Sequence, residues 1–226
     1  MLVLSNVFCG PLISAESASN PVFLYASLSG RPTFDEDARG GNPFATALVQ
    51  LLSAKSMSFS AFSTDLVALT RQTSKGSQQA EIVGGDHLAQ WQFLPTPRHE
   101  KRVALVLVFS DYSASNIRRS LPGAKRDHQR VDEALSRAGF VVTSLLNPNH
   151  EELAQALKTF RVRTANADVA VIYTTGHGFE KDGIPRVLLP YTRVNRANAL
   201  PVSELASAAR AKRANLIFYA ACRNRF

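Results

Sequence analysis

The stretch Asp168-Val-Ala-Val-Ile-Tyr-Thr-Thr-Gly-His-Gly178 decides how this chain folds. Its apolar part is short, β-branched or aromatic, and free of charge after Asp168, which is typical of a strand buried on both faces of a parallel sheet. A second run of this kind, Asn215-Leu-Ile-Phe-Tyr-Ala-Ala221, leads directly into Cys222. Functional groups gather beyond the carboxyl ends of such strands. His177 and Cys222 are therefore a candidate base and nucleophile.

The rest of the second half alternates between strand and helix patterns. Apolar runs predict further strands, and amphipathic or glycine-closed segments predict helices between them. This alternation predicts right-handed crossovers and a parallel sheet covered by helices on both faces. We expect strands at 103–109 and 140–146, a loop and helix within 121–138, helices at 151–160 and 202–211, and a polar loop between His177 and the last helix.

The first half is less regular. A strand is expected at residues 21–27, and a long loop rich in Gly, Asp and Arg at 28–42. Asn42 and Pro43 suit the cap and first turn of a helix that runs to Leu52. A second helix is expected over 59–71, and a short strand over 91–94.

Composition narrows the class of protein. Of the 226 residues, 45% are hydrophobic and 19% charged, which indicates a globular chain. No apolar run approaches the roughly 18 residues that span a bilayer, so we expect no membrane segment. The net charge is +8, and residues 101–226 carry ten more basic than acidic residues. Because the arginines are scattered, we attribute them to solvated helix faces and expect no specific nucleic-acid partner.

The chain has two cysteines, Cys9 and Cys222. Secreted proteins of this size often carry more, in pairs, so we expect a reducing, cytoplasmic setting that keeps a thiol nucleophile usable. The apolar start Met1–Gly10 lacks the positive region of a signal peptide.

The pair of reactive residues has a definite chemistry. A free thiol is mostly protonated at neutral pH, and a histidine can generate the thiolate and later protonate the leaving amine. The amide N–H groups of Gly178 and Cys222 are candidates for an oxyanion hole. A buried structural cysteine and a surface histidine are the alternative interpretation. A zinc site would need further ligands, and no Cys-x-x-Cys or His-x-x-x-His supports one.

Several motifs resemble the large subunit of the caspase-like cysteine proteases, especially the metacaspases and bacterial orthocaspases. In order, they are Val103-Ala-Leu-Val-Leu-Val108, Leu121-Pro-Gly-Ala-Lys-Arg-Asp127, Gly139-Phe-Val-Val142, Tyr173-Thr-Thr-Gly-His-Gly178 and Ala221-Cys-Arg-Asn224. The family's Gln-Ala-Cys pattern, with a histidine about 50 residues upstream, is matched at Ala221, Cys222 and Arg223 but not at Ala220 or Asn224.

Residues in the first half resemble the small subunit of the same family. Phe23-Leu-Tyr-Ala-Ser-Leu-Ser-Gly30 is similar to the strand that normally follows the catalytic cysteine, and Asp35-Glu-Asp-Ala-Arg-Gly-Gly-Asn-Pro-Phe44 is similar to the loop and helix start beyond it. In most relatives this subunit comes second. The order here resembles the circular permutation of type III metacaspases, which chain ends lying close together make feasible.

The resemblance implies one domain over residues 1–226 with the three-layer caspase-like α/β sandwich. It divides into an arm (1–20), a small-subunit-like part (21–95), a linker (96–102) and a large-subunit-like part (103–226). About six strands are expected, five of them parallel, with Gln90–Leu94 as the antiparallel edge and Val22–Ser27 beside the Cys222 strand. Arg98, Lys101 and Arg102 in the proline-flanked linker are a hypothetical self-cleavage site.

The resemblance also implies an endopeptidase that cleaves peptides or proteins after Arg or Lys. The sequence leaves its oligomeric state open, and we favour a monomer. Relatives place an acid two residues before the cysteine, where this chain has Ala220, and often another at the position of Thr192. Asp127, Asp35 and Asp37 are the candidates to bind the substrate cation instead. Asp127 has the alternative role of a helix-start residue. Few acids follow His177, so we expect no calcium or other metal and no cofactor.

Two other functions stay open. The missing acids would suit a catalytically weak caspase homologue that acts as a binding or scaffold module. An unrelated α/β protein that binds an anionic ligand through its basic half is the second.

Overall fold

The computed structural model describes residues 20–114, 119–190 and 199–224. The expected arm over residues 1–20 therefore lies outside the described residues, apart from Asn20. The helices and strands are β1 (Pro21–Tyr25), α1 (Pro43–Leu52), β2 (Met57–Ser58), α2 (Phe59–Thr73), β3 (Glu81–Val83), the 3₁₀ turn η1 (Asp86–Leu88), β4 (Gln92–Leu94), β5 (Arg102–Val108), α3 (Pro122–Arg137), β6 (Val141–Leu146), α4 (His150–Thr164), β7 (Val169–Thr175), β8 (Gly178–Lys181), β9 (Ile184–Leu188), β10 (Ala199–Pro201), α5 (Val202–Ala208) and β11 (Ala214–Ala220).

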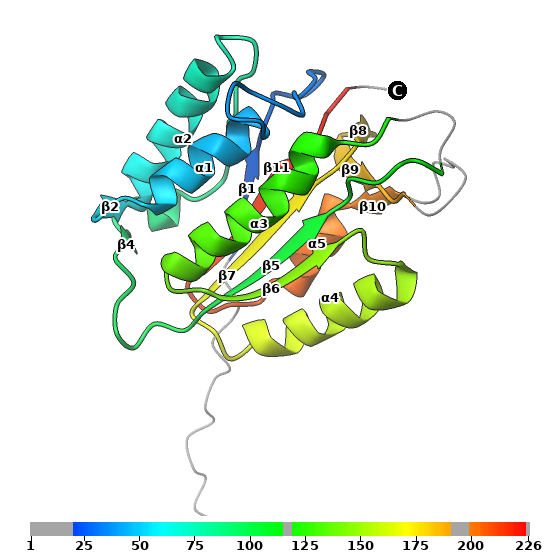
Figure 1. The fold of residues 1–226 in the computed structure, drawn as a ribbon. Coiled ribbons are helices and arrows are strands. Elements are labelled where there is room, and N and C mark those ends of the chain that lie inside the picture. The colour runs from blue at the N-terminus through cyan, green and yellow to red at the C-terminus, as the bar shows by residue number, and fades with distance from the viewer. Residues whose placement is uncertain (1–19, 115–118, 191–198, 225–226) are drawn as a thin grey trace, which may run out of the picture.

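A six-stranded sheet forms the centre of the molecule, in the order β3-β1-β11-β7-β5-β6 (Figure 1). All neighbouring strands are parallel except β3, which runs antiparallel to β1. The two strands predicted to carry the reactive residues, β7 and β11, are adjacent and fully buried. The predicted mostly parallel sheet is thus confirmed, and its two central strands end side by side.

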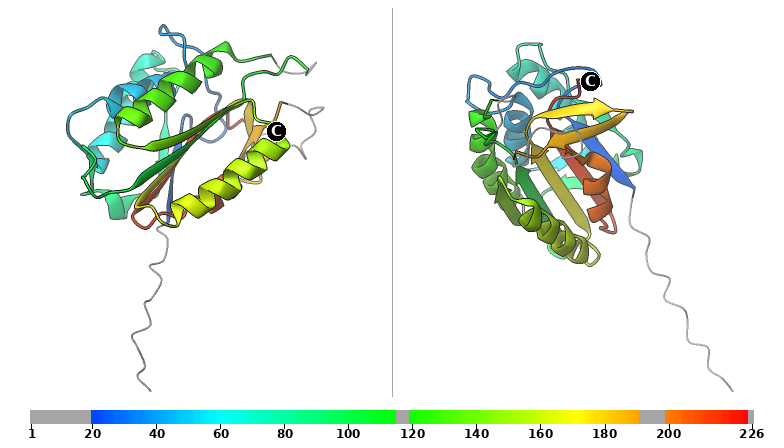
Figure 2. Two further views of the ribbon diagram at one scale, coloured as in Figure 1. Left: turned by 60° about the horizontal axis from the view of Figure 1, so that its bottom comes forward. Right: turned by 90° about the vertical axis from the view of Figure 1, so that its right-hand side faces the viewer.

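Helices cover both faces of this sheet, as Figure 2 shows. Along β7, Val171 and Tyr173 belong to the core beneath α1, α2 and α3, whereas Ala170 and Ile172 belong to the core beneath α4 and α5. Alternate residues of a strand point to opposite faces, so an uninterrupted apolar run fills both cores. This is the predicted three-layer α/β sandwich.

The strand expected beside the Cys222 strand is also where the sequence placed it. β1 pairs with β11 in parallel, from Pro21 opposite Asn215 to Tyr25 opposite Tyr219. Residues near the start of the chain therefore lie next to the strand that precedes Cys222.

The predicted antiparallel edge is wrong. Gln92–Leu94 does form a strand, β4, but it pairs with β2 in a separate two-stranded sheet. Its Phe93 ring lies 4.6 Å from the Phe62 ring, within a cluster of aromatic side chains under α2, so its apolar side is buried there. The antiparallel edge is instead β3, a three-residue strand, and edge strands are often this short.

The polar loop expected after His177 is wrong where the structure describes it, and residues 191–198, which include Thr192, lie outside the described residues. Residues 178–188 form the hairpin β8–β9, and β10 completes a three-stranded sheet. The hairpin turn is Asp182-Gly183, with φ of 54° and 74°. Both residues take left-handed dihedrals, as tight hairpin turns need, and Asp-Gly is a strong signal for such a turn.

One of the three basic residues in the hypothetical cleavage site is buried. Arg102 is 2% exposed, begins β5, and its guanidinium pairs with Glu100 and lies over the Trp91 ring. Of the basic residues in the hypothetical cleavage site, Arg102 is thus inaccessible to an active site, while Arg98 and Lys101 are exposed. Among the described residues, no helix is long and apolar enough to span a membrane.

Candidate active site

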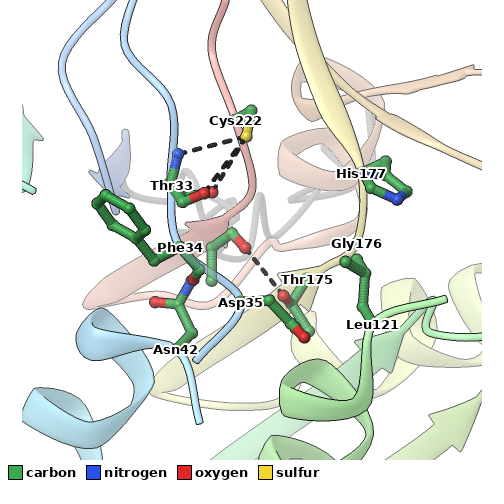
Figure 3. A pocket seen from close by; sticks show the side chains of 10 residues that line it. Thr33, Phe34, Asp35, Asn42, Leu121, Thr175, Gly176, His177 and Cys222 are labelled. Carbon is green, nitrogen blue, oxygen red and sulfur yellow. Dashed lines mark hydrogen bonds between the residues drawn. The ribbon is translucent and has the colours of Figure 1, made fainter. Parts of the chain in front are cut away.

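A pocket of about 130 Å³ lies at the carboxyl ends of β7 and β11. Both predicted reactive residues are in its wall (Figure 3). The lining residues are Thr33, Phe34, Asp35, Asn42, Leu121, Thr175, Gly176, His177, Ala220 and Cys222. Parallel strands end at the same edge of a sheet, so residues far apart in the sequence meet here.

The Cys222 thiol is partly buried and lies against Thr33. Its sulfur is 3.3 Å from the Thr33 N–H nitrogen and 3.4 Å from the Thr33 hydroxyl oxygen, and it is 3.7 Å from the Thr33 carbonyl oxygen. Figure 3 shows the sulfur turned toward Thr33. The thiol is therefore accessible from the pocket and touches the first half of the chain.

The backbone after Cys222 is held on both sides. Arg223 N–H donates to the Arg31 carbonyl at 3.1 Å, and Gly30 N–H donates to the Arg223 carbonyl at 2.9 Å. On the other side, Glu180 N–H of β8 donates to the Asn224 carbonyl at 3.0 Å. Residues 222–224 thus form an extended segment between β8 and residues 30–31.

Gly178 packs directly against this segment. A β-carbon at Gly178 would lie 2.2 Å from the Tyr219 hydroxyl oxygen and 2.7 Å from the Cys222 carbonyl oxygen, so only glycine fits. Backbone groups two residues apart in a strand face the same way, and Glu180 N–H faces residues 222–224. The Gly178 N–H is consequently directed to the Cys222 side of β8 rather than toward β9.

His177 is held at its backbone and at its ring. Its N–H donates to the Tyr112 hydroxyl at 3.0 Å, that hydroxyl donates to the Leu188 carbonyl at 2.8 Å, and Leu188 N–H donates to the His177 carbonyl at 2.7 Å. The Tyr112 hydroxyl thus bridges the His177 N–H and the Leu188 carbonyl, where two paired strands would normally form a direct backbone hydrogen bond. The imidazole packs edge-on against the Tyr112 ring, with 4.6 Å between centroids.

The imidazole and the thiol share the pocket but have separate partners. Nε2 of His177 lies 2.7 Å from the Arg119 carbonyl oxygen, and the ring points away from Cys222 in Figure 3. The sulfur contacts Thr33 instead. In enzymes without bound substrate, catalytic hydrogen bonds are often long or unformed. Rotation of the His177 side chain about Cα–Cβ is the movement that a direct contact would require.

A comparison with protein families bears on this pocket. The model of the caspase domain matches residues 101–226, which hold both reactive residues and more than half of the chain. The chain belongs to the caspase family. No curated protein matches it. Membership in this family implies a caspase-like peptidase that acts on peptide substrates.

The three aspartates expected to bind substrate have different positions in this caspase-family protein. Asp35 lines the pocket, and its carboxylate accepts from Gly123 N–H at 2.9 Å and Ala124 N–H at 2.8 Å, at the start of α3. Asp37 lies outside this pocket, in a hollow of about 270 Å³ near α1 and α2, where it accepts from Arg39 N–H.

Asp127 is fully buried and does not line the pocket. It lies beyond the first turn of α3, so it is not the helix-start residue of the alternative interpretation. Its carboxylate accepts from Asn42 N–H at 2.9 Å and from Arg130 at 2.8 Å. Burial raises the pKa of Asp127 to about 7, against the opposing effect of these two donors. Asp127 thus joins the 35–42 loop to α3.

Sequence reasoning missed two residues that contact the reactive pair, Thr33 and Tyr112. Tyr112 was within reach of prediction, because it follows closely after β5 at the same sheet edge as His177 and Cys222. Thr33 carries no such signal in the sequence. Among the described residues, no group of three or more His, Cys, Asp or Glu side chains comes together as a metal site would require.

Proposed function

We propose that this protein is a cysteine endopeptidase with Cys222 as nucleophile and His177 as general base and acid. The observation that carries the proposal is the shared pocket: the thiol and the imidazole come from adjacent parallel strands and line one cavity. A substrate amide in that cavity would meet the sulfur, and a rotated imidazole would meet both the thiol proton and the leaving nitrogen.

The backbone supports an oxyanion hole next to the nucleophile. Gly178 N–H is directed toward Cys222, and the absence of a side chain lets the two backbones approach closely. Together with the N–H of Cys222, it would donate to the oxygen of the tetrahedral intermediate. The Tyr219 hydroxyl supports this arrangement, since it donates to the Arg186 carbonyl at 2.7 Å and lies 3.2 Å from the Cys222 carbonyl oxygen.

We further propose that the pocket takes the P1 side chain of the substrate and that Arg or Lys fits there. Among the described residues that line the pocket, Asp35 is the one acid, and it would bind the substrate cation in place of the acid missing at Ala220. Thr175 and Asn42 add polar groups to the wall, and Ala220 leaves room. Asp127 and Asp37 lie outside the pocket, so Asp35 is the carboxylate we carry forward.

The strand order supports a permuted chain of the metacaspase and orthocaspase branch. β1 precedes Cys222 by almost 200 residues in the sequence, yet it lies parallel and adjacent to β11, which delivers Cys222. The family model matches residues 101–226, and residues before them supply Thr33, Asp35 and Asn42 to the pocket. Such a division is expected when small-subunit-like residues precede large-subunit-like residues.

A catalytically weak binding module is the second candidate. The observation that favours it is that the His177 ring contacts the Arg119 carbonyl while the thiol contacts Thr33. This arrangement is compatible with a resting enzyme and with an inactive homologue, so an activity measurement is needed to distinguish the two.

The test is a fluorogenic peptide panel with Arg, Lys, Asp and apolar residues at P1. We expect hydrolysis of the Arg and Lys peptides, a loss to background in Cys222→Ala, and a loss of about 10²- to 10⁴-fold in kcat in His177→Ala. His99→Ala is the matched control, because His99 lies in the exposed loop before β5 and should leave kcat unchanged.

Two outcomes would contradict the proposal. Activity that persists in Cys222→Ala would exclude this nucleophile. A folded wild type that cleaves no peptide and is not labelled by a thiol-reactive peptide probe would favour the binding module.

A further inference from the structure

A buried charge cluster lies immediately beyond the nucleophile. Arg223 is 7% exposed and its Nε donates to Glu180 at 3.0 Å. The same guanidinium pairs with Glu81 and donates to the Ser27 carbonyl at 3.2 Å. It also lies over the Tyr25 ring, 4.1 Å from the centroid.

The cluster joins parts of the chain that surround Cys222. Glu180 is on β8, two residues after Gly178, and Glu81 is on the edge strand β3. Ser29 donates to the other oxygen of Glu180 at 2.7 Å, so the loop after β1 is held as well. The Arg223 side chain thus connects the residue after Cys222 to three segments: β8, β3 and the loop after β1.

Burying these charges costs free energy, and a core of apolar side chains in the same place would avoid that cost. Well-packed apolar residues usually stabilise a fold as much as a buried ion pair does, because both ions lose their hydration. Burial also raises the pKa of Tyr25 to about 12, so this phenol stays neutral beside the ions. The cluster does fix the orientation of the Arg223 side chain, because a guanidinium that is hydrogen-bonded at several of its nitrogens can adopt few conformations.

We propose that Arg223 and Glu180 are positioning residues that hold Cys222 in register with β8. The ion pair fixes the side chain of Arg223, and the bonds of the Arg223 backbone to Gly30 and Arg31 fix the main chain. The distance and orientation between the Cys222 sulfur and the Gly178 N–H then stay constant. This inference rests on the proposed peptidase function only for its kinetic readout.

The two carboxylates of the cluster allow a matched comparison. Glu180→Gln and Glu81→Gln each remove one negative charge from the same guanidinium, and each leaves it a second carboxylate partner. Only Glu180 belongs to the strand that packs against Cys222. A purely structural role predicts similar losses from both variants, whereas the positioning role predicts a difference.

We expect Glu180→Gln to lower kcat about tenfold with KM within about twofold, because small displacements of reacting groups cost rate rather than binding. Hydrogen–deuterium exchange over residues 222–224 should rise about tenfold in the same variant. In Glu81→Gln, both quantities should stay within about twofold of wild type. Thermal unfolding of each variant gives the folded fraction for correction.

Equal effects of the two variants on kcat and exchange, or a kcat loss that only follows the folded fraction, would overturn the proposal. If the wild type cleaves no peptide, the peptidase function fails and exchange alone decides. Faster exchange in Glu180→Gln than in Glu81→Gln would then still support positioning, and equal exchange would refute it.

Discussion

Residues 101–224 and residues 20–100 contribute different things to one pocket. The first region supplies the thiol, the imidazole and part of the wall, through Leu121, Thr175, Gly176 and Ala220, whereas the second supplies Thr33, Phe34, Asp35 and Asn42. The two regions meet where the 35–42 loop lies on the start of α3. The proposed reactive pair and the proposed cation-binding acid, Asp35, thus lie in different regions, so we expect reactivity and selectivity to respond to different substitutions.

The largest effect is expected from a change in the reactive region. Gly178→Ala would place a methyl group within 3 Å of the Tyr219 hydroxyl and the Cys222 carbonyl, and the strand must shift. We expect kcat/KM to fall about 10²-fold or more, because a displacement of catalytic groups by about 1 Å can reduce the rate by that factor. Steady-state hydrolysis of the best peptide from the P1 panel measures this.

Gly183→Ala, in the turn of the same hairpin, is the control. A β-carbon there would meet nothing within 4 Å, although the positive φ of 74° makes the substitution cost about 1 kcal/mol of stability. Its kcat/KM should be near that of wild type. Equal losses in both variants would mean that the hairpin is merely intolerant of change.

The wall region should control selectivity. Asp35→Asn removes the carboxylate in the pocket, so kcat/KM for Arg peptides should fall about 10- to 100-fold, as for one charge-assisted hydrogen bond. Hydrolysis of peptides with an apolar P1 residue should change much less. Asp37→Asn is the matched control, two residues away but outside the pocket. A similar loss in Asp37→Asn would move the specificity site to the hollow near α1.

The stability of the protein should depend on pH through Asp127, which joins the 35–42 loop to α3. The folded protein holds the Asp127 proton up to a pH of about 7, whereas the unfolded chain releases it near 4. Between these values the folded state binds more protons, so this group lowers the free energy of unfolding as pH rises, by up to about 4 kcal/mol.

Urea unfolding at pH 5 and pH 8 tests this prediction. In Asp127→Asn this part of the pH dependence should disappear, whatever the absolute stability of the variant. The same difference between pH 5 and pH 8 in wild type and variant would show that Asp127 is ionised throughout.

The smallest effect is expected at Thr33. Thr33→Val removes the hydroxyl that lies 3.4 Å from the Cys222 sulfur but keeps the backbone N–H contact at 3.3 Å. Since hydroxyl–sulfur contacts are weak, we expect alkylation of Cys222 by iodoacetamide to change less than about threefold. Thr33→Ser should match wild type. A tenfold change in Thr33→Val would assign the hydroxyl a larger part in the chemistry.

The strands of the sheet could be predicted where the sequence is plainly apolar. β7 and β11 are buried at every position, so their runs identified them and placed His177 and Cys222 at one edge. The hairpin β8–β9 was missed because Glu180, Lys181 and Arg186 make the region polar, even though Asp182-Gly183 signalled a turn. β3 is too short for any period to show.

The wall of the pocket was less predictable for a physical reason. Thr33 and Cys222 are 189 residues apart, and nothing local in either segment indicates the contact. Asp35 and Asp37 have the same chemistry and nearly the same neighbours in sequence, and only the path of the loop turns one toward the pocket and the other away. The resemblance to the small subunit identified the loop but not which acid faces the cavity.

The position of β11 has a consequence for biosynthesis. This strand pairs with both β1 and β7, yet it follows both in the chain. Until residues 214–220 leave the ribosome, β1 and β7 lack their common neighbour, and pairings this distant in sequence form late. Cys222 emerges directly after the strand that closes the sheet. A nascent chain therefore has no assembled Cys222–His177 pocket until β11 has joined the sheet.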